Sequence, residues 1–144
     1  MTRWLAIVFA AGCGRQPAIP DASTAFCSDQ PPAPTFTNVQ RLFSTVCVTC
    51  HTSGVPLDLD APAYDRIVGK PAPDYTDPPA MDSCGGMLVV PDDPTTSYLY
   101  VKLTSSMPCA GVQMPRTDIG TSAPLATCAT TMIHDWIAAG AAND

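Results

Sequence analysis

Five consecutive residues, Cys47-Val48-Thr49-Cys50-His51, constrain this chain more than any other part of its sequence. Two thiols separated by two residues, and an imidazole directly after them, bring three reactive groups onto one short stretch of backbone. The segment before them has apolar residues at helical spacing, namely Val39, Leu42, Phe43 and Val46. We therefore predict a first helix from about residue 36 to residue 47, capped by Thr35 or Thr37, that ends inside this motif.

C-x-x-C-H is the attachment pattern of c-type haem. The two cysteines form thioether bonds with the haem vinyl groups, and the histidine supplies the proximal iron ligand. A zinc site generally needs four ligands and a thioredoxin-like pair needs a preceding strand, whereas this chain has one C-x-x-C and two histidines. The motif thus predicts covalent haem at Cys47 and Cys50 with His51 on the iron. A plain disulfide beside a surface histidine is the alternative.

The beginning of the chain has the pattern of an export signal. Arg3 precedes a short apolar run over residues 4–10, and Ala10-Ala11-Gly12-Cys13 resembles a bacterial lipobox with Ala10 in place of the usual leucine. We expect residues 1–12 to be removed, Cys13 to carry lipid and residues 13–34 to form a tether. Plain secretion and an uncleaved segment are the alternatives. The expected location is a membrane-anchored lipoprotein that faces the periplasm or the cell surface.

Export bears on the cysteines, because thiols outside the cytosol tend to be oxidised. Lipid at Cys13 and haem at Cys47 and Cys50 leave four of the seven cysteines, an even number that predicts two disulfides: Cys27, Cys84, Cys109 and Cys128. Three pairings are possible. Cys84 with Cys109 is favoured because both lie in glycine-containing loops around one helix, and this leaves Cys27 with Cys128.

The rest of the sequence predicts three more short helices. Asp60 is expected to cap a helix that Gly69 ends. Asp93 is likewise expected to cap a helix, with Pro94 in its first turn and apolar residues over 98–103. Ser122 is expected to cap a last helix whose apolar stripe runs from residue 125 to residue 137. Sixteen prolines and nine glycines predict long loops, and no strand alternation is evident. The predicted fold is all-α, with about four short helices in one domain over residues 35–144.

A second iron ligand is sought among the methionines. Met107 and Met114 both precede a proline, which holds the methionine backbone extended and suits a loop that presents sulfur. Met132 lies on the apolar stripe of the last helix and is expected in the core. His134 lies off that stripe and is expected to face solvent. Two methionines have no distinguishing context, Met81 and Met87.

From about Val39 onward the chain resembles the small class I cytochrome c domains of bacterial secreted and lipid-anchored proteins. Besides C-x-x-C-H, the shared features are L-D-L at 57–59, D-P-x-x-S-x-L-x-x-K-L at 93–103, G-x-x-M-P at 111–115 and W-I-x-x-G-A at 136–141. The resemblance implies the class I fold around one covalent haem c, with Met114 as the distal ligand. It also implies electron transfer with redox partner proteins rather than catalysis. Extra cysteines and a proline-rich insertion around residues 70–80 depart from the pattern.

Charge narrows the choice of partner. The formal net charge is −6 and the isoelectric point is about 4.5, which argues against nucleic acid. Two other functions stay open at this point: a haem enzyme whose sixth iron site is open to peroxide or small gases, and a disulfide-stabilised surface binding domain that carries no haem. The sequence does not indicate an oligomeric state.

Overall fold

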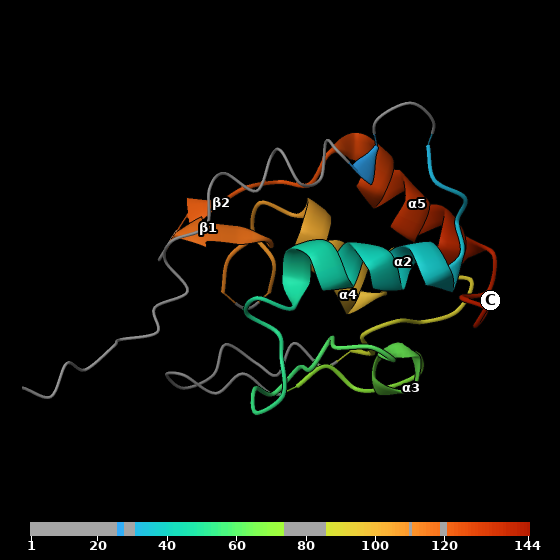
Figure 1. Ribbon diagram of the computed structural model, residues 1–144, viewed down its shortest axis with the longest axis horizontal. Helices are drawn as coiled ribbons and strands as arrows, with labels where there is room; N and C mark the ends of the chain where they lie inside the picture. Colours follow the sequence, from blue (N-terminus) through green and yellow to red (C-terminus); the bar gives the residue numbers. More distant parts are fainter. Residues whose placement is uncertain (1–25, 28–30, 74–85, 110, 119–120) are drawn as a thin grey trace, which may run out of the picture.

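The structure, a computed structural model, describes residues 26–27, 31–73, 86–109, 111–118 and 121–144 (Figure 1). These residues are mostly helical, and the helices are α2 (Phe36–Leu42), the π-helical η1 (Phe43–Cys47), α3 (Tyr64–Ile67), α4 (Tyr98–Thr104) and α5 (Thr127–Ala138). Two short antiparallel strands follow α4, β1 (Arg116–Asp118) and β2 (Thr121–Ser122). Within the described ranges, no helix has the length and apolar content that crossing a bilayer requires.

Several sequence predictions lie outside the described residues. They concern the signal segment 1–12, the lipidation residue Cys13, most of the tether, Met81 and Cys84. The structure therefore bears on the helical domain and on neither the export signal nor the anchor.

All the predicted helices form, but three start later than expected. Asp93 does not cap α4, which begins at Tyr98; its carboxylate accepts from the Thr95 and Thr96 amides instead. Thr35 caps α2 as predicted, accepting from the Asn38 amide at 3.3 Å. Asp60 does not cap α3, which begins at Tyr64; its carboxylate accepts from the Thr52 hydroxyl at 2.8 Å instead. Ser122 lies in β2, and α5 begins only at Thr127. For α3 and α5 the cause is the same. The residue after the expected cap precedes a proline, Pro62 or Pro124, and a proline disfavours helical backbone at the residue before it, so the helix starts later.

The β1–β2 hairpin is a correction to the sequence analysis, which found no strand alternation and expected only helices and long loops. Arg116 pairs with Ser122, and the Ala123 amide donates to the Pro115 carbonyl at 2.8 Å. Strands of two and three residues are too short to show a period of two in sequence, so pattern reasoning could not detect them.

The last helix organises the core. α5 contacts both α2 and α4, and the three helices lie together above α3 in Figure 1. Trp136 is 1% exposed, and its ring centroid lies 5.6 Å from that of Phe36 on α2. Trp136 therefore packs the last helix against the first, as its place on the apolar stripe of that helix requires. Met132 is also in the core, and Gly140 follows the helix with φ +95°, a left-handed conformation that glycine adopts without strain.

Residues near the two ends of the domain are tied together at the start of α2. The Asp144 carboxylate accepts from the Phe36 amide at 2.8 Å, and the Asp144 carbonyl accepts from the Thr37 hydroxyl at 2.7 Å. The first amides of a helix lack partners inside the helix, so these bonds satisfy donors that would otherwise need water. They fix the orientation of the helix that leads into C-x-x-C-H.

Ser97 yields a stability prediction, because it is a fully buried polar residue in front of α4. Its hydroxyl donates to the Asp93 carbonyl and accepts from the Val90 amide, both at 2.8 Å. Ser97→Ala should lower the free energy of unfolding by about 1–3 kcal/mol, since the Val90 amide loses its acceptor. Urea denaturation measures this change.

The matched control is Ser44→Ala, a change at an exposed position on η1. It should alter the free energy of unfolding by no more than about 0.5 kcal/mol. Equal effects of the two substitutions would show that the buried hydroxyl does not stabilise the turn.

Candidate functional site

The C-x-x-C-H motif begins where η1 ends. Phe43 and Val46 on η1 are buried, and Cys47 is its last residue. The Cys47 carbonyl then accepts from the Cys50 amide at 3.1 Å and from the His51 amide at 3.0 Å. These two bonds fold the motif into a compact turn, so both cysteines and the histidine are held by a helix that the core anchors.

His51 is held in one tautomer. Its Nδ1 lies 3.2 Å from the Leu57 carbonyl oxygen. A carbonyl only accepts, so Nδ1 carries the proton, and the neutral ring keeps an unprotonated Nε2. In the part of the chain that the structure describes, Nε2 makes no hydrogen bond. Metal-ligating histidines commonly donate their other ring nitrogen to a backbone carbonyl in this way, which leaves Nε2 to bind a metal.

The two cysteines of the motif differ. Cys47 is a free thiol, and burial raises its pKa from 9.0 to about 12, so it is protonated at neutral pH. Cys50 is exposed and disulfide-bonded. The alternative of a disulfide between the two is therefore not what the structure contains. A sulfur in a disulfide cannot form a thioether, so the bond at Cys50 and haem attachment at Cys50 exclude each other.

The loop that carries Met114 is fixed to α4. The Met114 amide donates to the Lys102 carbonyl, and the Gln113 side chain donates to the Leu103 carbonyl, both at 2.8 Å. Met114 is half-buried against the core. Met107, the other methionine that precedes proline, is 88% exposed. Of these two candidate ligands, only Met114 lies at the edge of the core.

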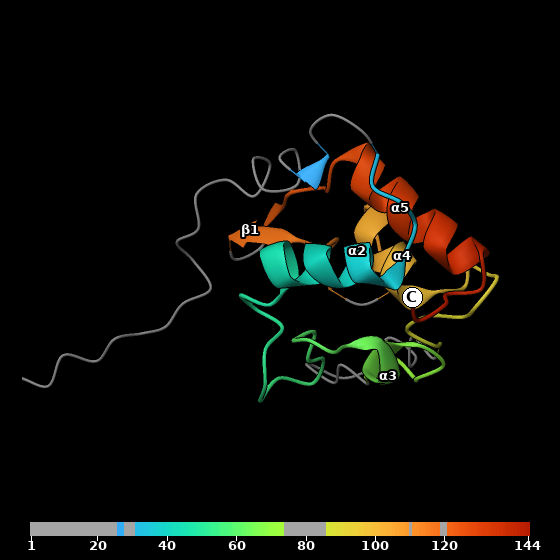
Figure 2. The same cartoon turned by 45° about the vertical axis from the view of Figure 1, so that its right-hand side comes forward.

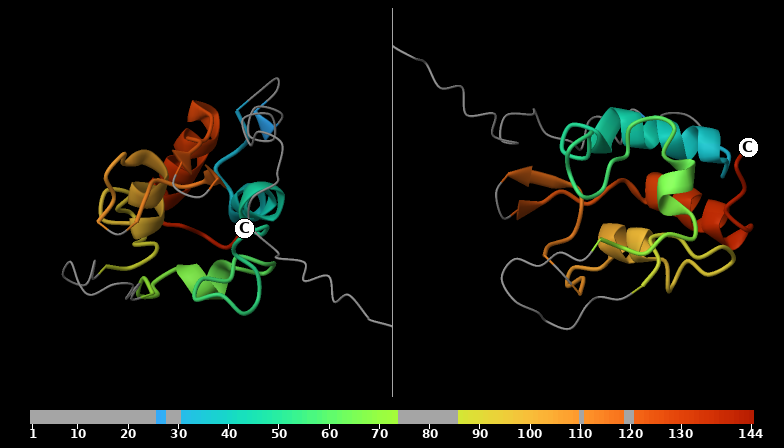
Figure 3. Two further views of the ribbon diagram at one scale, coloured as in Figure 1. Left: turned by 90° about the vertical axis from the view of Figure 1, so that its left-hand side faces the viewer. Right: turned by 90° about the horizontal axis from the view of Figure 1, so that it is seen from below.

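The motif and the methionine loop border the same hydrophobic core. Among the described residues, ten partly buried side chains pack against this core, and four of them belong to the motif, the loop after it and the methionine loop: Cys47, Val48, Leu57 and Met114. Figures 2 and 3 show the end of α2–η1 and the approach to β1 at the same end of the molecule. The donor set, two cysteine sulfurs, an imidazole and a methionine thioether, is the one that a c-type haem uses. Among the described residues there is no cluster of three or more His, Cys, Asp or Glu side chains that suits a bare metal ion.

Positive charge lies beside the methionine loop. Burial, and secondarily the charge of Arg116, lower the pKa of Lys102 below its ordinary value. The Lys102 carbonyl accepts from the Met114 amide, and Arg116 follows Met114 by two residues in sequence.

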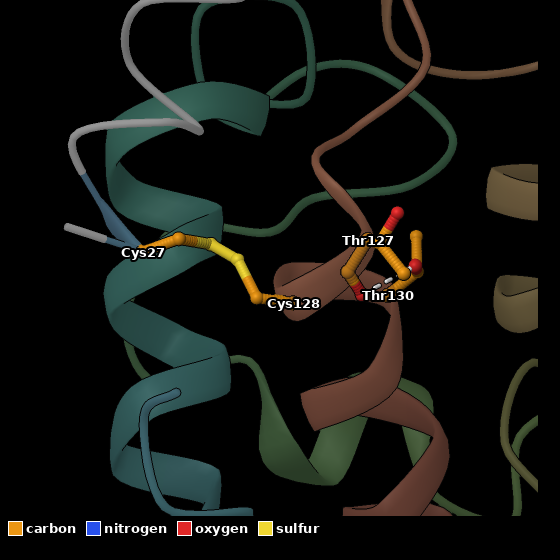
Figure 4. Close-up of a disulfide and its surroundings, with 4 residues drawn as sticks. All are labelled: Cys27, Thr127, Cys128 and Thr130. Carbon is orange, nitrogen blue, oxygen red and sulfur yellow. Dashed lines mark hydrogen bonds between the residues drawn. A yellow bond between two sulfur atoms is a disulfide. The ribbon is translucent and has the colours of Figure 1, made fainter. Parts of the chain in front are cut away.

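The structure also brings Cys27 and Cys128 together in a disulfide, the pairing that the sequence analysis favours. Their Cα atoms are 6.1 Å apart although 101 positions separate them in sequence. Figure 4 shows the bond joining the segment beside α2 to the start of α5. Cys109 is disulfide-bonded as well. Its expected partner, Cys84, is outside the described residues, so that pairing stays a prediction.

Two other candidate iron ligands, Met87 and His134, are not among the side chains that pack against the core. Met87 is partly exposed and holds the Tyr98 amide through its carbonyl at 3.0 Å. His134 is half-exposed and pairs with the Asp135 carboxylate at 2.9 Å, in agreement with its expected position off the apolar stripe.

Sequence reasoning missed Gln40. Its side chain donates to the Leu59 carbonyl at 3.1 Å and accepts from the Ala63 amide at 2.7 Å, so it joins α2 to the loop after the motif. Nothing in the sequence marks it, because one polar residue between apolar helix positions is ordinary surface pattern.

Comparisons with known proteins identify no relative of this chain. No family model matches the chain, and searches of curated proteins and of solved structures find no significant match. The function therefore has to be argued from the residues themselves.

The Cys27–Cys128 bond yields a second stability prediction. Replacing both residues, Cys27→Ser with Cys128→Ser, should lower the free energy of unfolding by about 2–4 kcal/mol, because a long loop of the unfolded chain is released. Denaturant unfolding of the two proteins measures the difference. Thr131→Ser, an exposed change on the same helix, is the control and should cost no more than about 0.5 kcal/mol. Peptide mapping without reduction that pairs Cys27 elsewhere would contradict the assignment.

Proposed function

We propose that this chain is an exported monohaem cytochrome c of class I type that transfers single electrons between redox partner proteins. The observation that carries the proposal is the hydrogen bond from His51 Nδ1 to the Leu57 carbonyl within a C-x-x-C-H motif. That bond leaves Nε2 available as an iron ligand, which is the role the motif gives to this histidine.

Each residue of the site has a role in the proposal. Cys47 and Cys50 would hold the haem covalently, and His51 would ligate its iron from one side. Met114 would ligate it from the other side, and a thioether ligand raises the reduction potential. The haem, when bound, supplies one-electron chemistry between ferrous and ferric iron. The chain itself supplies orientation and burial, through the anchored turn of the motif and the loop fixed to α4.

The proposed role is that of a carrier rather than an enzyme. Two protein ligands on the iron leave no position for a substrate, so a peroxide or gas chemistry would require Met114 to be absent or displaced. Export and a lipid anchor at Cys13 complete the proposal, and both rest on the sequence. The anchor would keep the domain at a membrane surface, close to redox partners.

The disulfide at Cys50 favours a second candidate function. A domain whose Cys50 is permanently oxidised would be a disulfide-stabilised surface binding domain without haem. The two candidates compete for one sulfur atom, so the state of Cys50 in protein from an exporting bacterium separates them.

Covalent haem is the first test. Protein exported in a bacterium with the haem-attachment machinery should keep haem through denaturing electrophoresis, and Cys47→Ala with Cys50→Ala should lose the haem stain entirely. Peptide mapping of the haem-loaded protein should find Cys50 outside any disulfide. Wild-type protein with no haem and an oxidised Cys50 would defeat the cytochrome proposal and support the second candidate.

The identity of the distal ligand is the second test. Met114→Ala should abolish the weak near-infrared absorption of methionine-ligated ferric haem and let the reduced protein bind carbon monoxide. Met107→Ala is the control, and it should change neither property because Met107 faces solvent. Carbon monoxide binding by the reduced wild-type protein would instead favour the enzyme with an open site.

A further inference from the structure

We infer that Gln40 is a positioning residue that fixes the His51 imidazole and thereby sets its strength as an iron ligand. The inference about the iron rests on the proposed function, whereas the positioning of the imidazole belongs to the chain alone. Gln40 lies on α2, outside the motif, and its two side-chain hydrogen bonds go to Leu59 and Ala63 rather than to His51 or a residue assigned to the haem.

Both ends of the Gln40 amide are used. Nε2 donates to the Leu59 carbonyl and Oε1 accepts from the Ala63 amide, across 19 and 23 positions of sequence. The helix that carries Gln40 is rigidly placed, because its neighbours Val39 and Leu42 have no exposed surface. A half-buried side chain on a fixed helix therefore holds two backbone groups of the loop in place.

The loop that Gln40 holds is the one that holds the histidine. The Leu59 amide donates to the His51 carbonyl at 2.8 Å, and the Leu57 carbonyl accepts from His51 Nδ1 at 3.2 Å. The carbonyl fixed by Gln40 is thus two residues from the carbonyl that orients the imidazole. Residues 52–56, which connect His51 to Leu57, are exposed, and Gly54 has φ +97°. This stretch therefore has little packing of its own to define its path.

A second clamp on the same loop is exposed. Arg66 donates to the Asp58 carbonyl at 3.0 Å and to the Asp60 carbonyl. Water competes for exposed hydrogen bonds and ion pairs, so their net contribution is small. The Gln40 bonds, which lie partly inside the fold, therefore act with the burial of Leu59 in the core to restrain the position of the Leu57 carbonyl.

The restraint has a redox consequence. A shorter and straighter bond from Nδ1 makes the imidazole more basic, and a more basic ligand stabilises ferric over ferrous iron. Loosening the Leu57 carbonyl should weaken this bond and shift the iron toward the ferrous state.

The first experiment uses the full chain without haem. Gln40→Met removes both hydrogen bonds and keeps the length of the side chain. In nitrogen NMR, the His51 ring should lose its preference for the Nδ1–H tautomer, and the Leu59 amide should exchange with solvent at least about tenfold faster, because its protecting loop opens more often. Asn38→Ala is the control, since it removes an amide on the same helix that bonds to Ala33. It should change neither property.

The second experiment uses the haem-loaded protein. Gln40→Met should shift the ferric–ferrous equilibrium about threefold toward ferrous, or ~28 mV at 59 mV per tenfold change for one electron. Asn38→Ala should leave the potential unchanged. If Gln40→Met does not fold, Gln40→Glu places an acceptor against the Leu59 carbonyl, and Asn38→Asp is its charge-matched control.

The outcomes separate the two ideas. An unchanged His51 tautomer and Leu59 exchange rate in a folded Gln40 variant would overturn the inference, whether or not haem attaches. A changed tautomer with an unchanged potential would overturn its redox part. Wild-type protein without haem would defeat the proposed function, and the NMR comparison would still decide the role of Gln40.

Discussion

The burial of Trp136 against Phe36 is the contact on which the rest of the structure depends. It brings α5 onto α2, and α5 in turn contacts α4, so the three main helices share one core. The motif extends from the end of α2–η1, and the methionine loop is bound to α4. The supports of the two halves of the candidate site are held together because α2 and α4 both pack on one apolar helix, which the sequence shows as the clearest stripe in the chain.

The parts of the fold that sequence predicts are those set by local chemistry. Apolar spacing fixed the existence of the helices, and the short helix before C-x-x-C-H lies where it was expected. The predicted starts of α3 and α5 were wrong because a proline disfavours helical backbone at the residue that follows the expected cap, Asp60 or Ser122. The contacts of Gln40 span about twenty residues, and no local pattern encodes a partner that only folding brings near.

Cysteine assignment shows where counting residues reaches its limit. Parity and export predicted disulfides, and the structure joins Cys27 to Cys128. The same counting reserved Cys50 for haem, whereas Cys50 is disulfide-bonded in the structure. One cysteine sulfur forms either a disulfide or a thioether. Which bond forms at Cys50 depends on whether oxidation or haem attachment comes first, and this order is kinetic and is not encoded in composition.

The bond from Cys27 to Cys128 also determines where mechanical load would enter the domain. Any tension on the chain before residue 27 would reach the first turn of α5 through a covalent link, the disulfide drawn in Figure 4. That path runs parallel to the peptide chain leading into α2. In a tethered protein, force from the tether would therefore pass through this bond to α5, the central helix of the core. The helix that leads into Cys47 and His51 would carry less of that force.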